Sequence, residues 1–154
     1  MSAASGFLRR LARTDEGWTF VETVIVVAII AVLTGTVGFA GSKYVDLARR
    51  VSAATQIETL RLSLEAYYLD AGAYPTAGQG LEALWEKPSL APVPAKWNGP
   101  YLDRRPAGDP WGNPFLFRRP GPEGLAYGIS SLGADAREGG VGAAADINSW
   151  EGDR

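Results

Sequence analysis

The sequence contains neither cysteine nor histidine among its 154 residues. Without cysteine there is no disulfide bond and no thiolate metal site. Without histidine the chain lacks the commonest general base, the usual zinc ligand and the Ser-His and Cys-His nucleophile pairs. An enzyme made from this chain would have to depend on carboxylates, lysine, tyrosine or serine alone. We therefore predict that the protein is not an enzyme.

Charge of one sign is also scarce, because the formal net charge is −2 and acidic and basic residues are dispersed. No basic patch with interleaved aromatic residues is present, which excludes nucleic acid as an expected partner. The length of 154 residues is sufficient for one ordinary domain and an attachment segment. The 19 glycines and 10 prolines gather after Ala71, which predicts a second half rich in turns.

One long apolar run lies near the start of the chain. From Trp18 to Ala40 the only polar residues are Glu22 and four threonines, and this length is enough to cross about 30 Å of hydrocarbon as a helix. Basic residues precede the run: Arg9, Arg10 and Arg13. Positive charge before an apolar segment keeps that end in the cytoplasm, so we predict a single membrane-spanning helix with the rest of the chain on the opposite side of the membrane.

Two simpler explanations of the apolar run remain open. The small residues of TGTVGFAGS (34–42) could form the cleavage site of a secretory signal peptide. A plain signal anchor accounts for the length and the arginines. Neither explains why a carboxylate, Glu22, stands near the start of the run, because an ionised carboxylate in hydrocarbon is costly unless it is paired.

Helical spacing continues beyond the apolar run. Apolar residues recur every three or four positions and form one stripe: Leu47, Val51, Ala54, Ile57, Leu60, Leu64 and Tyr67. No proline occurs between Met1 and Tyr74, so we predict a helix over about 18–69 whose amphipathic second half packs on a C-terminal domain. The glycines at 35, 38 and 41 either allow local unwinding or let neighbouring helices approach closely.

The remainder of the chain predicts a small α+β domain. A short helix is expected in residues 76–87, and short strands are expected at 114–119, at 125–130 and near 146–150. The stretch DPWGNP (109–114) has the composition of a turn capped by Asp109 and Asn113. Four tryptophans are expected to pack in the core or an interface: Trp85, Trp97, Trp111 and Trp150.

The junction before the apolar run, GWTFVETVIVVAIIAVL, resembles the class III leader junction of type IV pilins and pseudopilins. In that family a peptide is cut after a glycine, and the mature chain has an aromatic residue first and a glutamate fifth. Gly17, Trp18 and Glu22 occupy these positions. The resemblance implies cleavage after Gly17 by a prepilin peptidase, methylation of the new amine of Trp18, and pairing of Glu22 with the amine of a neighbouring subunit during assembly.

Three further blocks resemble one branch of this family, the major pseudopilins of type II secretion systems: YPTAGQGLEALWEKP (74–88), WNGPYLDRRPAGDPWGNPFLFRRPG (97–121) and SLGADAREGGVGAAADINSW (131–150). The resemblance implies a structural subunit of a periplasmic pseudopilus that exports folded proteins across the outer membrane. The implied partners are further copies of the chain in a helical homopolymer, minor pseudopilins, the peptidase and methylase, and an inner-membrane assembly platform. The implied organisation is a leader over 1–17, a transmembrane and assembly helix over 18–41, and a periplasmic domain over 42–154.

A glycine-rich acidic loop carries the candidate ligand chemistry. Asp135, Glu138 and Asp146 lie between Ser130 and Asp146, where glycines can turn carbonyl groups inward. Calcium prefers six to eight such hard oxygen ligands, although the loop lacks the EF-hand pattern. From the residues alone, we would interpret the stretch as a solvated acidic loop.

The pseudopilin resemblance implies that this loop binds calcium. The side chains of Asp135 and Asp146 and the carbonyl groups of Leu132 and Arg137 match the family's ligand positions. Such an ion would hold in one shape a loop that has no disulfide. Two positions depart from the family pattern: Ala136 stands where glycine is common, and Gly128 where aspartate is common.

The alternatives are a type IV pilin or competence pseudopilin, and a signal-anchored calcium-binding periplasmic module. Type IV pilins often have a paired-cysteine loop and lack the DPWGNP block. A glycosidase using Asp103 and Asp109 is the one enzyme that the carboxylates suggest, but both residues lie among prolines and glycines without a long scaffold.

Overall fold

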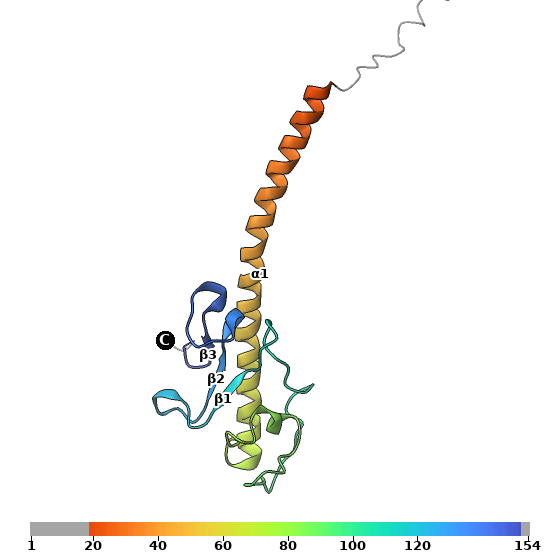
Figure 1. Ribbon diagram of the computed structural model, residues 1–154. Coiled ribbons are helices and arrows are strands. Elements are labelled where there is room, and N and C mark those ends of the chain that lie inside the picture. The colour runs from red at the N-terminus through yellow and green to blue at the C-terminus, as the bar shows by residue number, and fades with distance from the viewer. Residues whose placement is uncertain (1–18, 152–154) are drawn as a thin grey trace, which may run out of the picture. The chain divides into compact units, whose positions relative to one another are not determined.

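The computed structural model describes residues 19–151, with side chains for all of these except residues 36–42. One long helix, a small sheet and several 3-10 turns make up the fold (Figure 1). In chain order these elements are α1 (Phe20–Ala71), η1 (Leu81–Leu84), β1 (Leu116–Arg118), η2 (Pro122–Gly124), β2 (Gly128–Ser131), η3 (Gly133–Asp135), η4 (Gly142–Ala144) and β3 (Ile147–Asn148). The predicted α+β class, with a long helix and a short antiparallel sheet, is confirmed.

The chain divides into two compact units between Gly41 and Ser42, and α1 contributes to both. In the first unit the large apolar side chains are exposed, from Phe20, which is 84% exposed, to Leu33, which is 60% exposed. Among the residues described, we find no helix whose length and apolar character suffice to cross a membrane. The span predicted for residues 18–41 stays a prediction.

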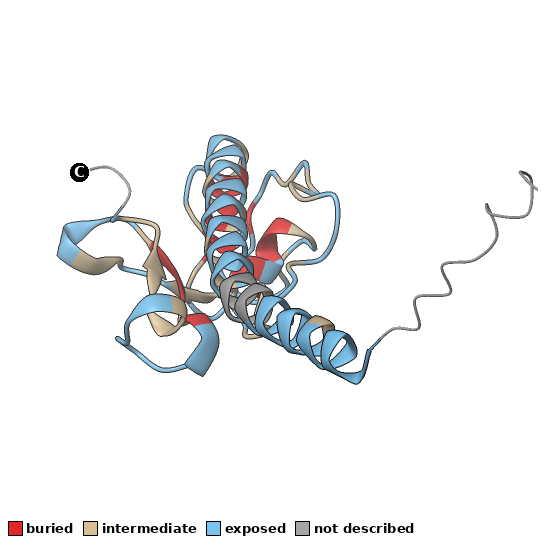
Figure 2. Cartoon of the chain, turned by 90° about the horizontal axis from the view of Figure 1, so that it is seen from above, coloured by how far each residue is buried: buried red, intermediate tan, exposed pale blue. Residues whose placement is uncertain are grey.

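In the second unit α1 buries one face, which shows as red segments on one side of the helix in Figure 2. The buried residues of this face are Ala53, Ile57, Leu60, Leu64 and Tyr67. The predicted stripe was right from Ile57 onward but wrong at three earlier positions: Leu47, Val51 and Ala54 are exposed. The buried face begins at Ala53: Leu47 and Val51 lie before it, and Ala54, next to Ala53, points to another side of the helix.

The cover for this face comes from η1 and β2. Leu64 on the helix, Leu84 on η1 and Ile129 on β2 are all fully buried and belong to one apolar cluster. Complete burial of a side chain of this size contributes about 2 kcal/mol relative to exposure. These contacts hold the sheet and the loops after it against α1.

The sheet has the order β1-β2-β3, and both pairs are antiparallel. Phe117 of β1 lies opposite Ile129, and Asn148 of β3 lies opposite Ser130. All four residues of the central strand β2 are buried, and all except Ile129 have small side chains. Each of the three strands lies where the sequence predicted one.

The short helix predicted over 76–87 is only a single 3-10 turn, η1. Gly80 has a φ of 61° and a ψ of −165°, which lies outside the helical region and ends any helix coming from Thr76. Pro88 limits the other side. The predicted place was right, but the length and the type of helix were wrong.

A cluster of aromatic side chains joins the end of α1 to the sheet. The hydroxyl of Tyr74 donates to both carboxylate oxygens of Glu65, at 2.9 and 3.0 Å, and the hydroxyl of Tyr127 donates to one of them at 3.2 Å. The rings of Tyr74 and Tyr127 meet edge to face with centroids 4.7 Å apart. Burial, together with the hydrogen bond to Glu65, raises the pKa of Tyr74 to about 12.

This pKa predicts how stability changes at alkaline pH. Because the folded-state pKa of Tyr74 lies above the ordinary value of 10.0, the folded protein holds the phenolic proton more tightly than the unfolded chain does. The contribution is fully present below pH 10 and is lost as the pH rises toward 12. In Tyr74→Phe we expect the fall in unfolding free energy over this range to be shallower than in the wild type, measured by urea denaturation at each pH. An equal slope in both proteins would contradict the assignment.

Gly128 provides a second prediction. A Cβ atom at this position would lie 2.8 Å from Cζ3 of Trp150 and 2.8 Å from Cδ of Pro122, closer than real Cβ contacts allow. The position thus has no room for a larger side chain such as that of aspartate. Gly128→Ala should lower the unfolding free energy by about 1–3 kcal/mol, as overpacking does. In a Trp150→Leu background, which removes one of the two obstacles, the same change should cost less, and an undiminished cost would rule out the contact with Trp150.

Candidate functional site

The acidic loop connects β2 to β3 and doubles back on itself. Its two turns, η3 and η4, approach so closely that a Cβ at Gly133 would lie 2.9 Å from the carbonyl oxygen of Ala143 and 3.0 Å from that of Ala145. Gly133 also has a φ of 64°, a conformation that side chains other than glycine's rarely adopt. The glycine therefore allows backbone carbonyl groups to gather at the neck of the loop.

Asp146 has the most informative environment of the predicted ligands. Its Oδ2 accepts the N–H of Gly139 at 3.0 Å, whereas its Oδ1 is buried and receives no hydrogen bond. A buried carboxylate oxygen without a donor is unfavourable. A cation would supply the missing partner, so the donor set of this loop fits a hard metal ion such as calcium.

The other acidic residues have local roles. Oδ1 of Asp135 accepts the N–H of Arg137 at 3.2 Å, which closes a turn within the loop. Glu138 pairs instead with Arg118 of β1. Within residues 19–151 no three acidic side chains gather into a ready-made metal cluster. Calcium at this loop would consequently need backbone carbonyl groups, and those of Leu132 and Arg137 are the predicted ones.

Ala136 keeps the backbone conformation of a glycine. Its φ of 55° and ψ of 32° place it in the left-handed region, at the end of η3. For a residue with a side chain this conformation costs about 1–2 kcal/mol. The departure at Ala136 therefore leaves the path of the loop intact and adds strain to it.

The stretch DPWGNP forms a turn, as its composition predicted, and the structure adds that this turn supports the acidic loop. Asp109 is only 5% exposed, and its Oδ1 accepts the N–H groups of Trp111 and Asn113 at 3.0 and 2.9 Å. Its Oδ2 accepts the hydroxyl of Ser131 at 2.6 Å, and the side-chain amide of Asn113 donates to the carbonyl of Gly133 at 2.9 Å. With both of its oxygens engaged, Asp109 is a structural residue and unsuited to acid–base catalysis.

Sequence reasoning missed one residue that contacts the loop. Nη1 of Arg50, on α1, donates to the carbonyl oxygens of Gly142 and Ala145, both at 2.8 Å. Nothing in the sequence near Arg50 signals this partner, because the two groups are 92 and 95 residues apart.

The predicted assembly residues lie at the other end of α1. Gly17 and Trp18 are outside the described residues. Glu22 is exposed in the first turn, and its backbone N–H donates to the hydroxyl oxygen of Thr19 at 3.2 Å. Threonine followed three residues later by glutamate is the capping-box pattern, a signal in the sequence that we had not used. Glu22 thus also favours the start of the helix, where the helix dipole stabilises negative charge.

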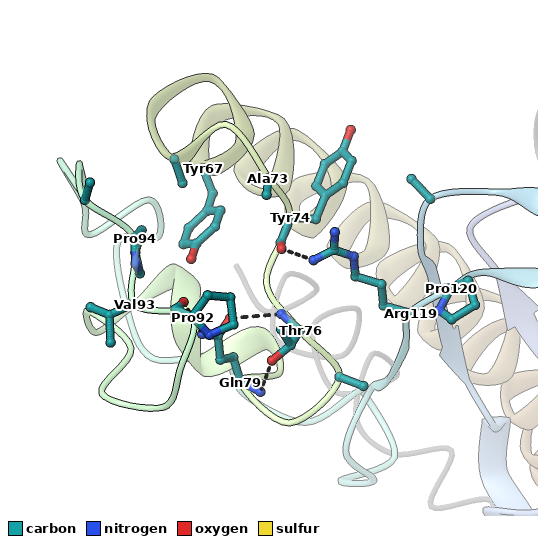
Figure 3. A pocket seen from close by; sticks show the side chains of 14 residues that line it. Tyr67, Ala73, Tyr74, Thr76, Gln79, Pro92, Val93, Pro94, Arg119 and Pro120 are labelled. Atoms are coloured by element: carbon teal, nitrogen blue, oxygen red, sulfur yellow. Dashed lines mark hydrogen bonds between the residues drawn. The ribbon is translucent and has the colours of Figure 1, made fainter.

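A cavity elsewhere in the described part of the chain is lined by none of the predicted functional residues. It has a volume of about 650 Å³ and lies between Tyr67, Tyr74, Pro92 and Arg119 (Figure 3). The polar groups around it hold loops together. Nε2 of Gln79 donates to the carbonyl groups of Leu90 and Pro92 at 2.7 and 2.9 Å, and Arg119 donates to the carbonyl group of Tyr74.

Comparison with known proteins agrees with this arrangement. The family described as "Type II secretion system (T2SS), protein G" matches residues 42–150. The chain is 40% identical over 140 residues to the type II secretion system core protein G of Pseudomonas aeruginosa, covering 90% of this chain and 97% of that protein. It is also 40% identical over 141 residues to the core protein G of Vibrio cholerae, covering 90% and 93%.

A solved structure gives the same result. The crystal structure of the major pseudopilin from the type 2 secretion system of enterohaemorrhagic Escherichia coli matches with a TM-score of 0.59 and 34% identity. The match covers 68% of this chain and 89% of that one. The predicted resemblance to the major pseudopilins is confirmed: the chain belongs to the protein G family of type II secretion systems, the family of the major pseudopilins.

Proposed function

We propose that this protein is the structural subunit of the periplasmic pseudopilus of a type II secretion system, which exports folded proteins across the outer membrane. The observation that carries this proposal is the 40% identity to core protein G over 90% of the chain. The protein acts by assembling and catalyses no reaction. Its partners are further copies of itself, minor pseudopilins, the prepilin peptidase and methylase, and an inner-membrane assembly platform.

The exposed apolar residues at the start of α1 support this function. Val21, Val27 and Leu33 are between 59% and 63% exposed, although their spacing of six residues places them on three different sides of the helix. A helix that is apolar on all sides requires a nonpolar environment. We propose that residues 18–41 lie in the inner membrane before assembly and against neighbouring subunits in the filament, with the arginine-rich leader on the cytoplasmic side.

Glu22 has a specific part in this scheme. Cleavage after Gly17 creates a cationic amine on Trp18, and methylation keeps its charge. Among the described residues no cationic side chain pairs with Glu22. An amine from a neighbouring subunit can supply the opposite charge that a carboxylate needs in an apolar environment.

The change Glu22→Ala tests this proposal. We expect the variant to be processed normally but to be absent from the sheared filament fraction of cells that also produce the secretion apparatus. Mass spectrometry of the membrane fraction should show a chain that begins at N-methylated Trp18 in both proteins. The physical reason is that the unpaired amine of Trp18 has no partner in the apolar interior of the filament.

Asp46→Ala is the matched control, because this acidic residue also lies on α1 but beyond the first unit and outside the apolar run. It should leave assembly intact. If Glu22→Ala gave the same filament yield as the wild type, the proposed role of Glu22 in assembly would be wrong. An unprocessed wild-type chain that starts at Met1 would instead indicate an ordinary anchor.

We further propose that the acidic loop binds calcium. The buried, donor-free Oδ1 of Asp146 and the close gathering of carbonyl groups at Gly133 support this proposal. Asp135 and Asp146 are the proposed side-chain ligands, and Leu132 and Arg137 are the proposed carbonyl ligands. When bound, the ion supplies charge that holds these oxygens together in a loop without a disulfide.

Thermal unfolding of the full chain in detergent, followed by tryptophan fluorescence, tests calcium binding. An ion that binds only the folded state stabilises it by about 2.7 kcal/mol at a hundredfold excess over its Kd. We expect the midpoint to rise with calcium relative to chelator, and to rise little with magnesium. Asp146→Asn should abolish the rise, because an amide carries no charge for the ion.

Glu138→Gln is the control for this experiment, since Glu138 lies in the same loop but pairs with Arg118. It should retain the calcium-dependent rise. A wild-type midpoint that does not respond to calcium would show that the loop is held by its protein contacts alone.

A further inference from the structure

Arg50 joins the acidic loop to the long helix. One nitrogen, Nη1, donates to the carbonyl oxygens of both Gly142 and Ala145 at 2.8 Å. These carbonyl groups lie at the two ends of a four-residue stretch that contains η4. Because a charged donor makes stronger hydrogen bonds than a neutral one, the stretch is fixed to α1 at both of its ends.

The choice of partner by Arg50 is specific. Asp46 lies four residues earlier on α1, a spacing at which oppositely charged side chains commonly pair. Within the described residues no ion pair forms between them, and the guanidinium reaches across to the loop instead. The side chain of the adjacent Arg49 is exposed. Among residues 19–151 it makes no hydrogen bond or ion pair.

The stretch held by Arg50 leads directly into Asp146. Ala145, the second acceptor, is the residue before Asp146. The two hydrogen bonds of Arg50, which we call the Arg50 clamp, therefore fix the backbone from which the Asp146 side chain extends. A second contact, from the N–H of Gly139 to Oδ2 of Asp146, fixes the carboxylate itself. Together the two contacts leave Oδ1 buried and without a donor.

We propose that Arg50 is a positioning residue of the cation site: it anchors the 142–145 backbone to α1 and thereby aims Asp146 at the bound ion. This inference rests on the proposed calcium binding. The two hydrogen bonds of Arg50 connect the loop to the second half of α1, within the same compact unit. Groups that orient metal ligands typically change metal affinity by about 10- to 100-fold when they are removed.

Removing Arg50 could also strengthen calcium binding, so the direction of the change in affinity distinguishes two roles of this residue. Arg50 is itself a cation, so a purely electrostatic role would repel calcium, and its removal would tighten binding. Arg50→Gln removes the charge and shortens the side chain, whereas Arg50→Lys keeps the charge but replaces the planar guanidinium, whose Nη1 reaches both carbonyl groups, with a shorter ammonium group. If positioning dominates, both variants bind calcium more weakly. If repulsion dominates, Arg50→Gln binds more tightly and Arg50→Lys changes little.

The experiment is isothermal titration of calcium chloride into the full chain in detergent, with the wild type, Arg50→Gln, Arg50→Lys and the matched control Arg49→Gln. We expect the Kd of Arg50→Gln to rise by about tenfold or more, and that of Arg49→Gln to stay within about twofold of the wild type. Thermal melts provide a second readout. The midpoint lost in Arg50→Gln should be larger in calcium than in chelator, because the clamp and the ion stabilise the same loop conformation.

Two results would overturn the inference, and they differ from each other. If the wild type binds calcium and Arg50→Gln binds it equally or more tightly, with the same midpoint loss in calcium and chelator, Arg50 is only a structural contact and calcium binding stands. If the wild type shows no binding heat and no calcium-dependent midpoint, the calcium proposal itself fails, and the positioning role fails with it.

Discussion

Burial of one face of α1 is the constraint on which the domain depends. Leu64 on the helix, Leu84 on η1 and Ile129 on β2 are fully buried and share one cluster, although they come from three separate parts of the chain. The sheet they hold has strands of only two to four residues, too short to be stable alone. Without the apolar face of α1, the segments that follow Ala71 would have no common surface to fold on.

Polar side chains stabilise the loops that the small apolar core does not hold. Asp109 receives hydrogen bonds from its own turn and from Ser131, Gln79 closes the loop near Pro92, and Arg50 holds the acidic loop. Gln79 and Arg50 each donate to carbonyl groups of an irregular stretch of backbone farther along the chain, whereas Asp109 joins its own turn to the side chain of Ser131. Such contacts hold loop segments together, as disulfide bonds do in other small domains. A cation bound at Asp146 would hold the acidic loop together in the same way.

The features that the sequence predicts correctly are those that depend on local patterns. Helical spacing and the lack of proline located α1, short segments next to turn residues located all three strands, and turn chemistry located the caps of Asp109. The predictions were wrong or incomplete where the local structure depends on residues far away in the sequence. The exposure of Val51 and the shortness of η1 depend on where the domain ends and on the conformation of Gly80. The clamp of Arg50 depends on a loop more than 90 residues away, which no local pattern describes. Calcium binding and the role of Glu22 stay predictions.

The two halves of α1 thus have different requirements. The second half meets its need for apolar burial within the chain, whereas the exposed apolar residues from Phe20 to Leu33 require other molecules. Assembly into a pseudopilus meets that requirement, and this is the central claim. Electron cryo-microscopy of filaments formed by this chain in cells with its secretion apparatus tests it most directly. The account predicts residues 20–33 buried between subunits, with the Glu22 carboxylate against a neighbour's amino terminus. Filaments in which these residues face water would contradict it.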